Sequence, residues 1–301
     1  MELYESLLES YKNFDNINND RVVIKIFVSY IHRSFLFKSK ILTPVHLGRA
    51  IETRPAKGIT ISNADIEWLH KNCIGDDIGD NISETNRRIG FFTGTYWAWK
   101  NYEKIGNPEY FGSFGFRRLL SCDFLENLTQ YDCIFPYMID MTNSGGTIKD
   151  HIIKLHGLNM YQIMVDIFKN NHPNDFYNFE KYLQLNRAYW YEIYIMKKQI
   201  FFDFCNFIYP ILLDCFNIAS YKYVTHSNTL EMDYMRQIGE MRDVAYIAEV
   251  VTGYYCYQLQ DKYIVKHQKI KYFIEQKVPQ TMIKFLKRKH YSKRNEKKES
   301  D

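Results

Sequence analysis

Short apolar runs alternate with helical patterns in the first half of the chain. The run RVVIKIFVSY at 21–30 is rich in β-branched residues and almost continuously apolar, as is typical of a strand buried on both faces. The runs PEYFGSFGF at 108–116 and YDCIFPYMI at 131–139 have the same character. Because strands of parallel sheets are covered on both faces, these three runs predict a parallel sheet that begins with 21–30.

Apolar residues at helical spacing predict the elements around these strands. Residues 1–18 and 83–104 show this spacing, and residues 62–72 show it weakly. Residues 31–62 follow neither period, so we expect irregular structure there.

Helical patterns dominate beyond about residue 148. Within them, EIYIMKKQIFF at 192–202 also fits a strand and hairpin, and 233–260 fits a further amphipathic helix. Strands that alternate with helices early, followed by a helix-rich half, predict an α/β fold. No apolar run reaches the roughly 18 residues of a membrane-spanning helix, and the N-terminal segment lacks the regions of a signal peptide.

Composition adds a surplus of aromatic rings and a set of scattered thiols. Aromatic residues make up 17% of the 301 positions, so rings remain available to stack on sugars or bases after the core is filled. The six cysteines form no CxxC pair, which favours reduced thiols in a cytoplasmic protein over disulfides or a zinc site.

Charge divides the chain into an acidic body and a basic tail. Residues 262–301 carry 13 Lys and Arg against 4 Asp and Glu, a balance of +9, and the other 261 residues carry 26 against 31, a balance of −5. The tail mixes these basic residues with bulky apolar ones, which fits either a segment held at an anionic membrane surface or a solvated end. The acidic body argues against nucleic-acid binding.

The pattern of elements and the division of charge together predict three parts: a helical lead-in (1–20), a main domain (21–261) and the basic tail (262–301).

The segment IGDDIGDNISETN at 74–86, which we call the acidic loop, concentrates ligand-type oxygen atoms. It holds four carboxylates, two asparagines and two glycines, and the glycines predict a loop in which Asn81 or Ser83 caps the next helix. Three interpretations stay open here: a solvated loop, a site for a hard divalent cation, or a contact with the hydroxyls and base of a nucleotide or sugar. The spacing does not fit an EF-hand. A nucleotide would be expected at the carboxyl ends of the strands.

Three sequence blocks together resemble one known family. They are GDDIGDNISETN at 75–86, TGTYWAWKN at 93–101 and EYFGSFGFRRLL at 109–120, and further similarity extends the match over roughly residues 22–260. The family comprises bacterial glycosyltransferases found in capsular-polysaccharide and O-antigen gene clusters and long known only as a domain of unknown function. Its members have His-Tyr where this chain has Gly115 and Phe116.

The resemblance implies a GT-A-like nucleotide-binding sheet with a helix-rich C-terminal half. It implies transfer of a sugar from a nucleoside diphosphate, with a UDP-sugar as the expected donor, to a hydroxyl of a capsule, O-antigen or lipooligosaccharide glycan. The basic tail would then hold a cytoplasmic enzyme at the inner membrane face, beside a lipid-linked glycan acceptor. Because several polar positions of the family pattern are changed, a non-catalytic relative that binds sugar nucleotides or glycans is the alternative.

The resemblance also indicates which residues meet the sugar donor. They are Asp76, Asp77, Asp80, Asn81, Asn86, Arg117, Arg118 and Arg242. Many GT-A enzymes place a metal-binding Asp-x-Asp motif after a central strand, and in this chain Arg117 and Arg118 stand there. Two guanidiniums can bind diphosphate oxygens through paired hydrogen bonds, so we assign no metal ligands. Mg²⁺ or Mn²⁺ on the carboxylates of the acidic loop is the alternative, as is a structural ion pair between that loop and one of the arginines.

An inverting transfer also needs a general base for the acceptor hydroxyl. The candidates are Asp140, Asp150, His151, His156 and Glu192, and each also fits a structural role. Of these we name Asp150 and Glu192. For contact with the acceptor the candidates are Trp97 and His156. Trp97 and Trp99 stand two positions apart on a predicted helix and point in different directions, so at most one of them is expected to meet a ligand.

Overall fold

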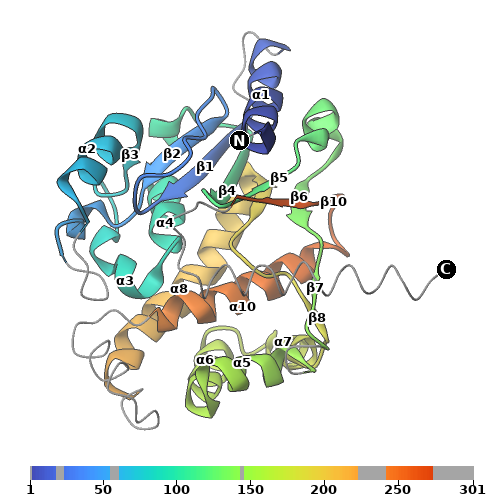
Figure 1. Ribbon diagram of the computed structural model, residues 1–301. Helices are drawn as coiled ribbons and strands as arrows, with labels where there is room; N and C mark the ends of the chain where they lie inside the picture. Colours follow the sequence, from blue (N-terminus) through green and yellow to red (C-terminus); the bar gives the residue numbers. More distant parts are fainter. Residues whose placement is uncertain (1, 18–23, 55–60, 143–145, 223–241, 274–301) are drawn as a thin grey trace.

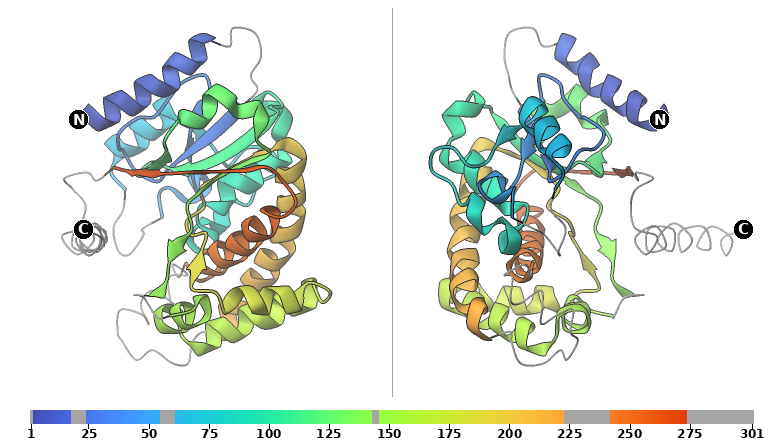
Figure 2. Two further views of the ribbon diagram at one scale, coloured as in Figure 1. Left: turned by 90° about the vertical axis from the view of Figure 1, so that its right-hand side faces the viewer. Right: turned by 60° about the vertical axis from the view of Figure 1, so that its left-hand side comes forward.

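The computed structural model describes residues 2–17, 24–54, 61–142, 146–222 and 242–273. A nine-stranded sheet with helices on both faces forms its centre (Figures 1 and 2), which is the predicted α/β class. The strands follow the order β10-β6-β9-β4-β1-β2-β3, with β5 and β11 joined beside β4. Their bounds are β1 (Ile24–Tyr30), β2 (Leu42–His46), β3 (Ile74–Gly75), β4 (Tyr110–Gly115), β5 (Arg118–Leu120), β6 (Cys133–Pro136), β9 (Tyr194–Lys197), β10 (Val265–Gln268) and β11 (Ile270–Tyr272).

The sheet is mixed rather than wholly parallel. β1 lies between β2 and β4 and is parallel to both, and β3 continues the parallel part beside β2. β9 breaks this pattern, because it runs antiparallel between β4 and β6. The strands predicted at 21–30, 108–116 and 131–139 are confirmed as β1, β4 and β6, but the predicted parallel arrangement holds for only part of the sheet.

β2 was not predicted, because it lies within the segment 31–62 that follows neither period. Pro44 stands in its middle, and proline argues against a strand since it cannot donate to a neighbour. β3 pairs only with Val45 and His46, so Pro44 has a strand on one side alone. The strand predicted within 192–202 is confirmed as β9, but helix α8 begins at the next residue and there is no hairpin.

Alternating side chains of the strands divide the core into two layers. Phe27 and Phe111 point into a cluster formed with α4 (Phe92–Lys100), α8 (Lys198–Lys222) and α10 (Asp243–Leu259). Ile26 and Val28 point to the opposite face, where α1 (Glu2–Ile17) and α2 (Asn63–Asn72) pack. Full burial of such a side chain stabilises the fold by about 1.5–3 kcal/mol. Helices on both faces of the sheet therefore stabilise the position of these strands.

Three further helices pack at the end of the molecule remote from β1 and α1 (Figures 1 and 2): α5 (Ile148–His156), α6 (Leu158–Asn171) and α7 (Phe176–Leu183). The small ribbon of β7 (Ile139–Asp140) and β8 (Arg187–Ala188) lies between them and the sheet. Among the described helices, α8 alone is long and apolar enough, by length and composition, to span a membrane, a stretch that we did not expect. Half of that stretch, 198–217, is buried in the fold, as in a core helix.

The single helix predicted over 83–104 is four short pieces. They are η2 (Ser83–Thr85), α3 (Asn86–Ile89), α4 and η3 (Tyr102–Ile105). Gly90 separates α3 from α4 with φ 66°, a backbone conformation that favours glycine. Apolar spacing predicted the buried positions of this stretch but not the break, since a periodic pattern does not register a local turn.

The predicted boundary at residue 261 is wrong, because the first part of the basic tail belongs to the sheet. β10 pairs with β6, and β11 pairs with β5 next to Arg118. The predicted helix over 233–260 corresponds to α10, with 233–241 outside the described residues. Residues 274–301, which carry 9 Lys and Arg against 4 Asp and Glu, also lie outside them.

Candidate active site at the carboxyl edge of the sheet

The parallel strands β3, β2, β1 and β4 end at one edge of the sheet, and the predicted site residues gather along it. Asp76 directly follows β3, while Arg117 and Arg118 follow β4. Glu192 precedes β9, and since β9 is antiparallel to β4 it reaches the same edge. Three strand spacings separate β3 from β4, about 14 Å in all, so the edge carries two neighbouring polar clusters.

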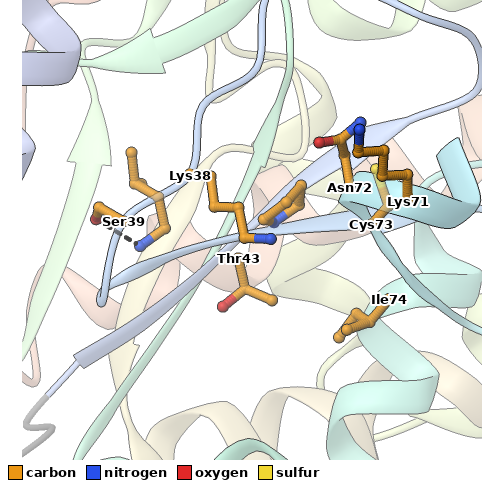
Figure 3. A pocket seen from close by; sticks show the side chains of 9 residues that line it. Lys38, Ser39, Thr43, Lys71, Asn72, Cys73 and Ile74 are labelled. Atoms are coloured by element: carbon orange, nitrogen blue, oxygen red, sulfur yellow. Dashed lines mark hydrogen bonds between the residues drawn. The ribbon is translucent and has the colours of Figure 1, made fainter. Parts of the chain in front are cut away.

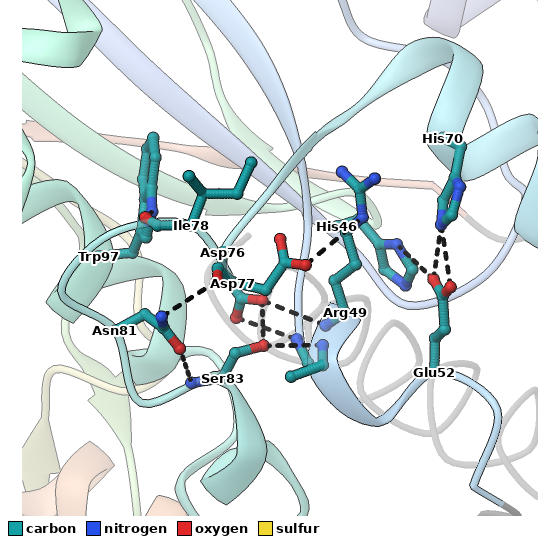
Figure 4. Close-up of polar contacts among 12 residues, drawn as sticks. His46, Arg49, Glu52, His70, Asp76, Asp77, Ile78, Asn81, Ser83 and Trp97 are labelled. Carbon is teal, nitrogen blue, oxygen red and sulfur yellow. Dashed lines mark hydrogen bonds and ion pairs between the residues drawn. The ribbon is translucent and has the colours of Figure 1, made fainter.

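Asp76 is the centre of the first cluster and is fully buried. Its carboxylate accepts backbone hydrogen bonds from Gly48 at 2.9 Å and Arg49 at 3.1 Å (Figure 4). It also accepts the hydroxyls of Ser83 at 2.5 Å and Thr93 at 2.7 Å. Both oxygens are therefore occupied by the protein itself, and Asp76 braces the acidic loop instead of reaching a ligand.

Asn81 organises the turn that follows. Its amide donates to the carbonyls of Asp77 and Gly79 at 3.1 and 2.8 Å, and its side-chain oxygen accepts the backbone N–H of Ser83 (Figure 4). Neither Asn81 nor Ser83 caps a helix as predicted: η2 begins after Ile82, and the Ser83 hydroxyl points to Asp76.

Two carboxylates of the loop keep free coordination capacity. One oxygen of Asp77 lies 3.8 Å from the Arg49 guanidinium, and the other is buried with no hydrogen bond among the described residues. Asp80 is exposed, and among the described residues its carboxylate accepts one hydrogen bond, from the Tyr96 hydroxyl at 3.1 Å. Asn86 links the end of the acidic loop to the turn before α4, since its amide donates to the carbonyl of Gly90 and to the hydroxyl of Thr93.

Trp97 does not line a ligand site. It is only 6% exposed, and its ring packs beside Phe27 in the core. Its indole nitrogen donates to the carbonyl of Ile78 at 2.6 Å (Figure 4). This placement contradicts the predicted contact with the acceptor and makes Trp97 an anchor of the acidic loop.

The second cluster brings together charged residues that are far apart in the sequence. Glu192 is 7% exposed, and the cations nearest to it belong to Arg118 and Arg242. Burial is the strongest influence on Glu192 and raises its pKa, while the two guanidiniums act in the opposite direction. Glu249 of α10 is a further neighbour of Glu192, and it too acts to lower the pKa of Glu192.

The two arginines after β4 have different surroundings. The Arg118 guanidinium lies 3.9 Å from the ring centre of Tyr191 and faces Glu192. The Arg117 guanidinium lies over Phe116 at 5.1 Å, and the Arg117 carbonyl accepts the backbone N–H of Phe273. Of the predicted pair, it is Arg118 that joins the cluster, together with the exposed Arg242 at the start of α10.

His156 borders this second cluster. Its ring stacks on Tyr246 at 4.1 Å, and Tyr246 in turn lies near Arg242 and Glu249. Burial, with a smaller contribution from His151, lowers the pKa of His156 to about 4, so its ring is neutral near pH 7.

Asp150 caps a helix and is not among the described contacts of either polar cluster. It is exposed, and its carboxylate accepts the N–H and the hydroxyl of Thr147 in a capping box at the start of α5. These two hydrogen bonds lower its pKa. The geometry explains Asp150 as a helix cap and gives its predicted role as a general base no support.

Sequence reasoning missed Glu249 and Tyr246. The segment MRDVAYIAEVV at 241–251 held the signal, because Arg242, Tyr246 and Glu249 stand at positions i, i+4 and i+7, which share one face of a helix. Tyr191 is a further omission, and its φ of 74° is unusual for a residue other than glycine.

A described pocket lies away from both polar clusters. It has a volume of about 260 Å³ and lies between the start of β2 and the end of α2 (Figure 3). Its lining is Lys38, Ser39, Leu42, Thr43, Pro44, Lys71, Asn72, Cys73 and Ile74. None of the predicted site residues belongs to it, so we base the site on the polar clusters and not on this hollow.

Comparison with known proteins identifies the fold and the family. A solved structure described as the apo structure of the bifunctional glycosyltransferase WbbM matches 84% of this chain with a TM-score of 0.65 and 21% identity. The chain spans 45% of that protein's length, and the fold is GT-A-like. No curated protein sequence matches. A family model described as a domain of unknown function, DUF4422, matches residues 25–258, and the chain belongs to this family.

Proposed function

We propose that the protein is a glycosyltransferase that moves a sugar from a nucleoside diphosphate sugar to a hydroxyl group. The observation that carries the proposal is the convergence of Arg118, Arg242 and the buried Glu192 at the carboxyl end of β4. The GT-A-like fold supports it, because open α/β sheets bind ligands at this edge.

The arginines meet the charge that the reaction develops. When the bond between the anomeric carbon and the diphosphate oxygen breaks, its electron pair stays on the diphosphate, and a cationic group must stabilise it. Guanidiniums suit this task because each presents several N–H groups in a fixed plane. Glu192 places a buried carboxyl group near Arg118, and the exposed Arg242 lies at the start of α10.

The carboxyl pair Glu192–Glu249 supplies the base in this proposal. For an inverting transfer, the acceptor oxygen forms its bond to the anomeric carbon while its proton passes to a carboxylate. A base near its operating pH is most effective, and burial moves Glu192 in that direction. His156 and Tyr246 would border the acceptor, since they stack next to this pair.

A divalent cation also fits the acidic loop. Asp77 and Asp80 would hold it, because one oxygen of Asp77 is buried with no hydrogen bond from the part of the chain that the structure describes, and Asp80 is exposed. Mg²⁺ or Mn²⁺ prefers such oxygen ligands and would add positive charge at the acidic loop when bound, as an alternative to the arginines for binding the diphosphate. Asp76 is not available for this purpose, since its oxygens are already occupied.

We further propose a UDP-sugar as donor, and as acceptor a capsule, O-antigen or lipooligosaccharide glycan, free or lipid-linked. We place the enzyme in the cytoplasm at the inner face of the membrane. The support is the sequence resemblance and the basic residues of 274–301. No nucleic-acid partner is proposed, because the body of the chain is acidic.

A panel of sugar nucleotides tests the proposal. A ligand at 100 times its dissociation constant stabilises the fold by about 2.7 kcal/mol, so thermal unfolding identifies the donor, and Arg118→Ala should abolish the shift. Transfer to a glycan acceptor must follow. Binding without turnover would favour the alternative of a non-catalytic relative, and no shift with any sugar nucleotide would contradict the proposal.

A further inference from the structure

Three potential metal ligands meet behind the acidic loop, outside both polar clusters of the proposed site. His46 ends β2, Glu52 follows the short helix η1 (Arg49–Ile51), and His70 lies in the last turn of α2 (Figure 4). One ligand atom from each lies within 4.8 Å of the others. Three separate elements thus direct two imidazoles and one carboxylate at the same point.

His46 has an unsatisfied nitrogen at this point. The residue is only 2% exposed, and its Nδ1 makes no hydrogen bond among the described residues. The nearest charged atom is a Glu52 carboxylate oxygen, 3.4 Å away. An unpaired polar atom in the interior costs about 1–3 kcal/mol, so a native structure usually provides a partner for it.

The distances suit a small cation. Zinc binds nitrogen and carboxylate oxygen at about 2.0–2.2 Å in tetrahedral sites, which places neighbouring ligand atoms roughly 3.4 Å apart. The pair His46 Nδ1 and Glu52 Oε2 already has this separation. His70 Nε2 lies 2.8 Å from the same carboxylate and needs to withdraw by about half an ångström, which its position at 40% exposure permits.

We propose that His46, Glu52 and His70 form a binding site for a zinc-class divalent cation. Two imidazole nitrogens select Zn²⁺ or a neighbouring transition metal over Mg²⁺ and Ca²⁺, which prefer oxygen ligands throughout. The exposed His70 leaves a path for the ion and a fourth position for water. This inference stands apart from the proposed transfer reaction, because none of the three residues belongs to the two polar clusters.

The cation would join β2 to α2 and tighten the acidic loop from behind. The carbonyl of His46 accepts the backbone N–H of Asp76 at 3.3 Å. The backbone of Gly48 and Arg49, between His46 and Glu52, donates to the Asp76 carboxylate. A metal that fixes the 46–52 segment therefore also fixes the brace of the acidic loop.

Zinc titration of the full chain without a histidine tag tests the site, after removal of metal with a chelator and dialysis. We expect one Zn²⁺ to bind per chain by calorimetry and to raise the thermal midpoint, while Mg²⁺ at the same concentration does neither. Bound Co²⁺ should show visible absorption typical of a tetrahedral site. Metal content of the protein as purified is measured in parallel.

His70→Gln and Glu52→Gln should each weaken zinc binding by about 10–100-fold or more, because loss of even an outer partner has an effect of this size. Both residues are at least partly exposed, so the variants are expected to fold. His172→Gln is the matched control, because His172 is the C-cap residue of α6 and belongs to another part of the fold. Its ring nitrogen has the Phe207 carbonyl as its hydrogen-bond partner. Zinc binding that is absent in the native chain, or unchanged in both variants, would mean that Glu52 and His70 form only an ion pair.

Discussion

The indole nitrogen of Trp97 donates a 2.6 Å hydrogen bond to the carbonyl of Ile78, which ties a helix of the core to the acidic loop. Trp97→Phe removes the donor and leaves that carbonyl without this partner. We expect the free energy of unfolding to fall by about 1–3 kcal/mol, and binding of the sugar donor to weaken because the loop loses an anchor. Chemical denaturation and calorimetry measure the two effects.

Trp99→Phe is the control for this variant, since Trp99 stacks on Tyr209 and is not among the described contacts of the acidic loop. It should lower stability without changing donor binding. Equal donor affinity in Trp97→Phe and the native chain would show that the loop needs no anchor from the core.

Variants of Asp76 and Asp80 should distinguish a residue that stabilises the acidic loop from a residue that contacts a ligand. Asp76→Asn places an amide N–H₂ among four hydrogen-bond donors, and hydrogen bonds to a charged group are each worth about 1.5–3 kcal/mol, so we expect a loss of roughly 3 kcal/mol or more. Asp80→Asn, at an exposed position, should change stability by less than about 0.5 kcal/mol. If Asp80 meets the sugar donor or a cation, this second variant should nevertheless weaken binding. Chemical denaturation and calorimetry decide, and a large stability loss in Asp80→Asn would refute the distinction.

Arg118→Lys and Arg242→Lys should slow transfer strongly while the sugar nucleotide still binds. Lysine keeps the positive charge but loses the planar set of N–H groups that pairs with diphosphate oxygens. We expect a fall in kcat of about 100-fold for the arginine that meets the leaving group, of the size seen when one stabilising donor is removed from a transition state. Arg117→Lys should have a smaller effect, because its guanidinium lies over Phe116 and not beside Glu192.

A chelator added to the same assay separates the arginines from a cation. Transfer that survives the chelator assigns the diphosphate charge to the arginines. Transfer that stops and returns with Mn²⁺ assigns it to the carboxylates of the acidic loop.

The raised pKa of Glu192 should appear in two pH profiles. Its active form as a base is the carboxylate, so kcat should fall toward acid with a midpoint above the ordinary value of about 4.3 for glutamate. The native chain also holds this proton more tightly than the unfolded chain does, so the free energy of unfolding should decrease as pH rises through the raised pKa.

Glu192→Gln should abolish transfer and remove that decrease in stability. Glu249→Gln keeps a hydrogen-bonding side chain beside Glu192 and should shift the acid limb without abolishing transfer. A native profile whose acid limb has the ordinary glutamate midpoint would argue against the pair as the base.

A chain shortened after Phe273 should keep its fold and its sugar-nucleotide binding but lose sedimentation with anionic vesicles. Residues 274–301 carry an excess of five basic charges, and attraction to anionic lipid weakens as the Debye length falls from about 10 Å at 0.1 M salt to about 3 Å at 1 M. Shortening after residue 261 should instead destabilise the protein, because it removes β10 and β11. Full-length protein that ignores anionic vesicles at low salt would make the tail a solvated end.

Sequence periodicity predicted the central strands because a strand buried on both faces has a strong local signature. β1, β4 and β6 all have it, and Arg117 and Arg118 were placed from the end of the run that forms β4. β2 contains Pro44 and β10 is largely polar, so neither has a continuous apolar run, and the pairing of both depends on partners distant in the sequence. The break at Gly90 depends on a single backbone angle, which composition does not encode.

The candidate site was predicted less completely than the fold. Residue type drew attention to Asp76 and Trp97, but the distinction between a ligand contact and an internal brace depends on where the neighbouring donors lie. Gly48 and Thr93 donate hydrogen bonds to the Asp76 carboxylate, and they come from segments that no local sequence pattern connects to Asp76. Glu249 was missed for the same reason, since its partner Glu192 is 57 positions away.

The pairing of β11 with β5 sets an order of events during synthesis. Tyr272 lies opposite Arg118 in that pair, so the strand that bears the proposed leaving-group arginine stays without its outer neighbour until residue 272 has left the ribosome. Chains fold from the N-terminus as they emerge, and β1 to β4 can assemble early. The nascent protein therefore completes its proposed catalytic edge later than β1 to β4, and a chain released before residue 272 would carry the acidic loop without a finished site for transfer.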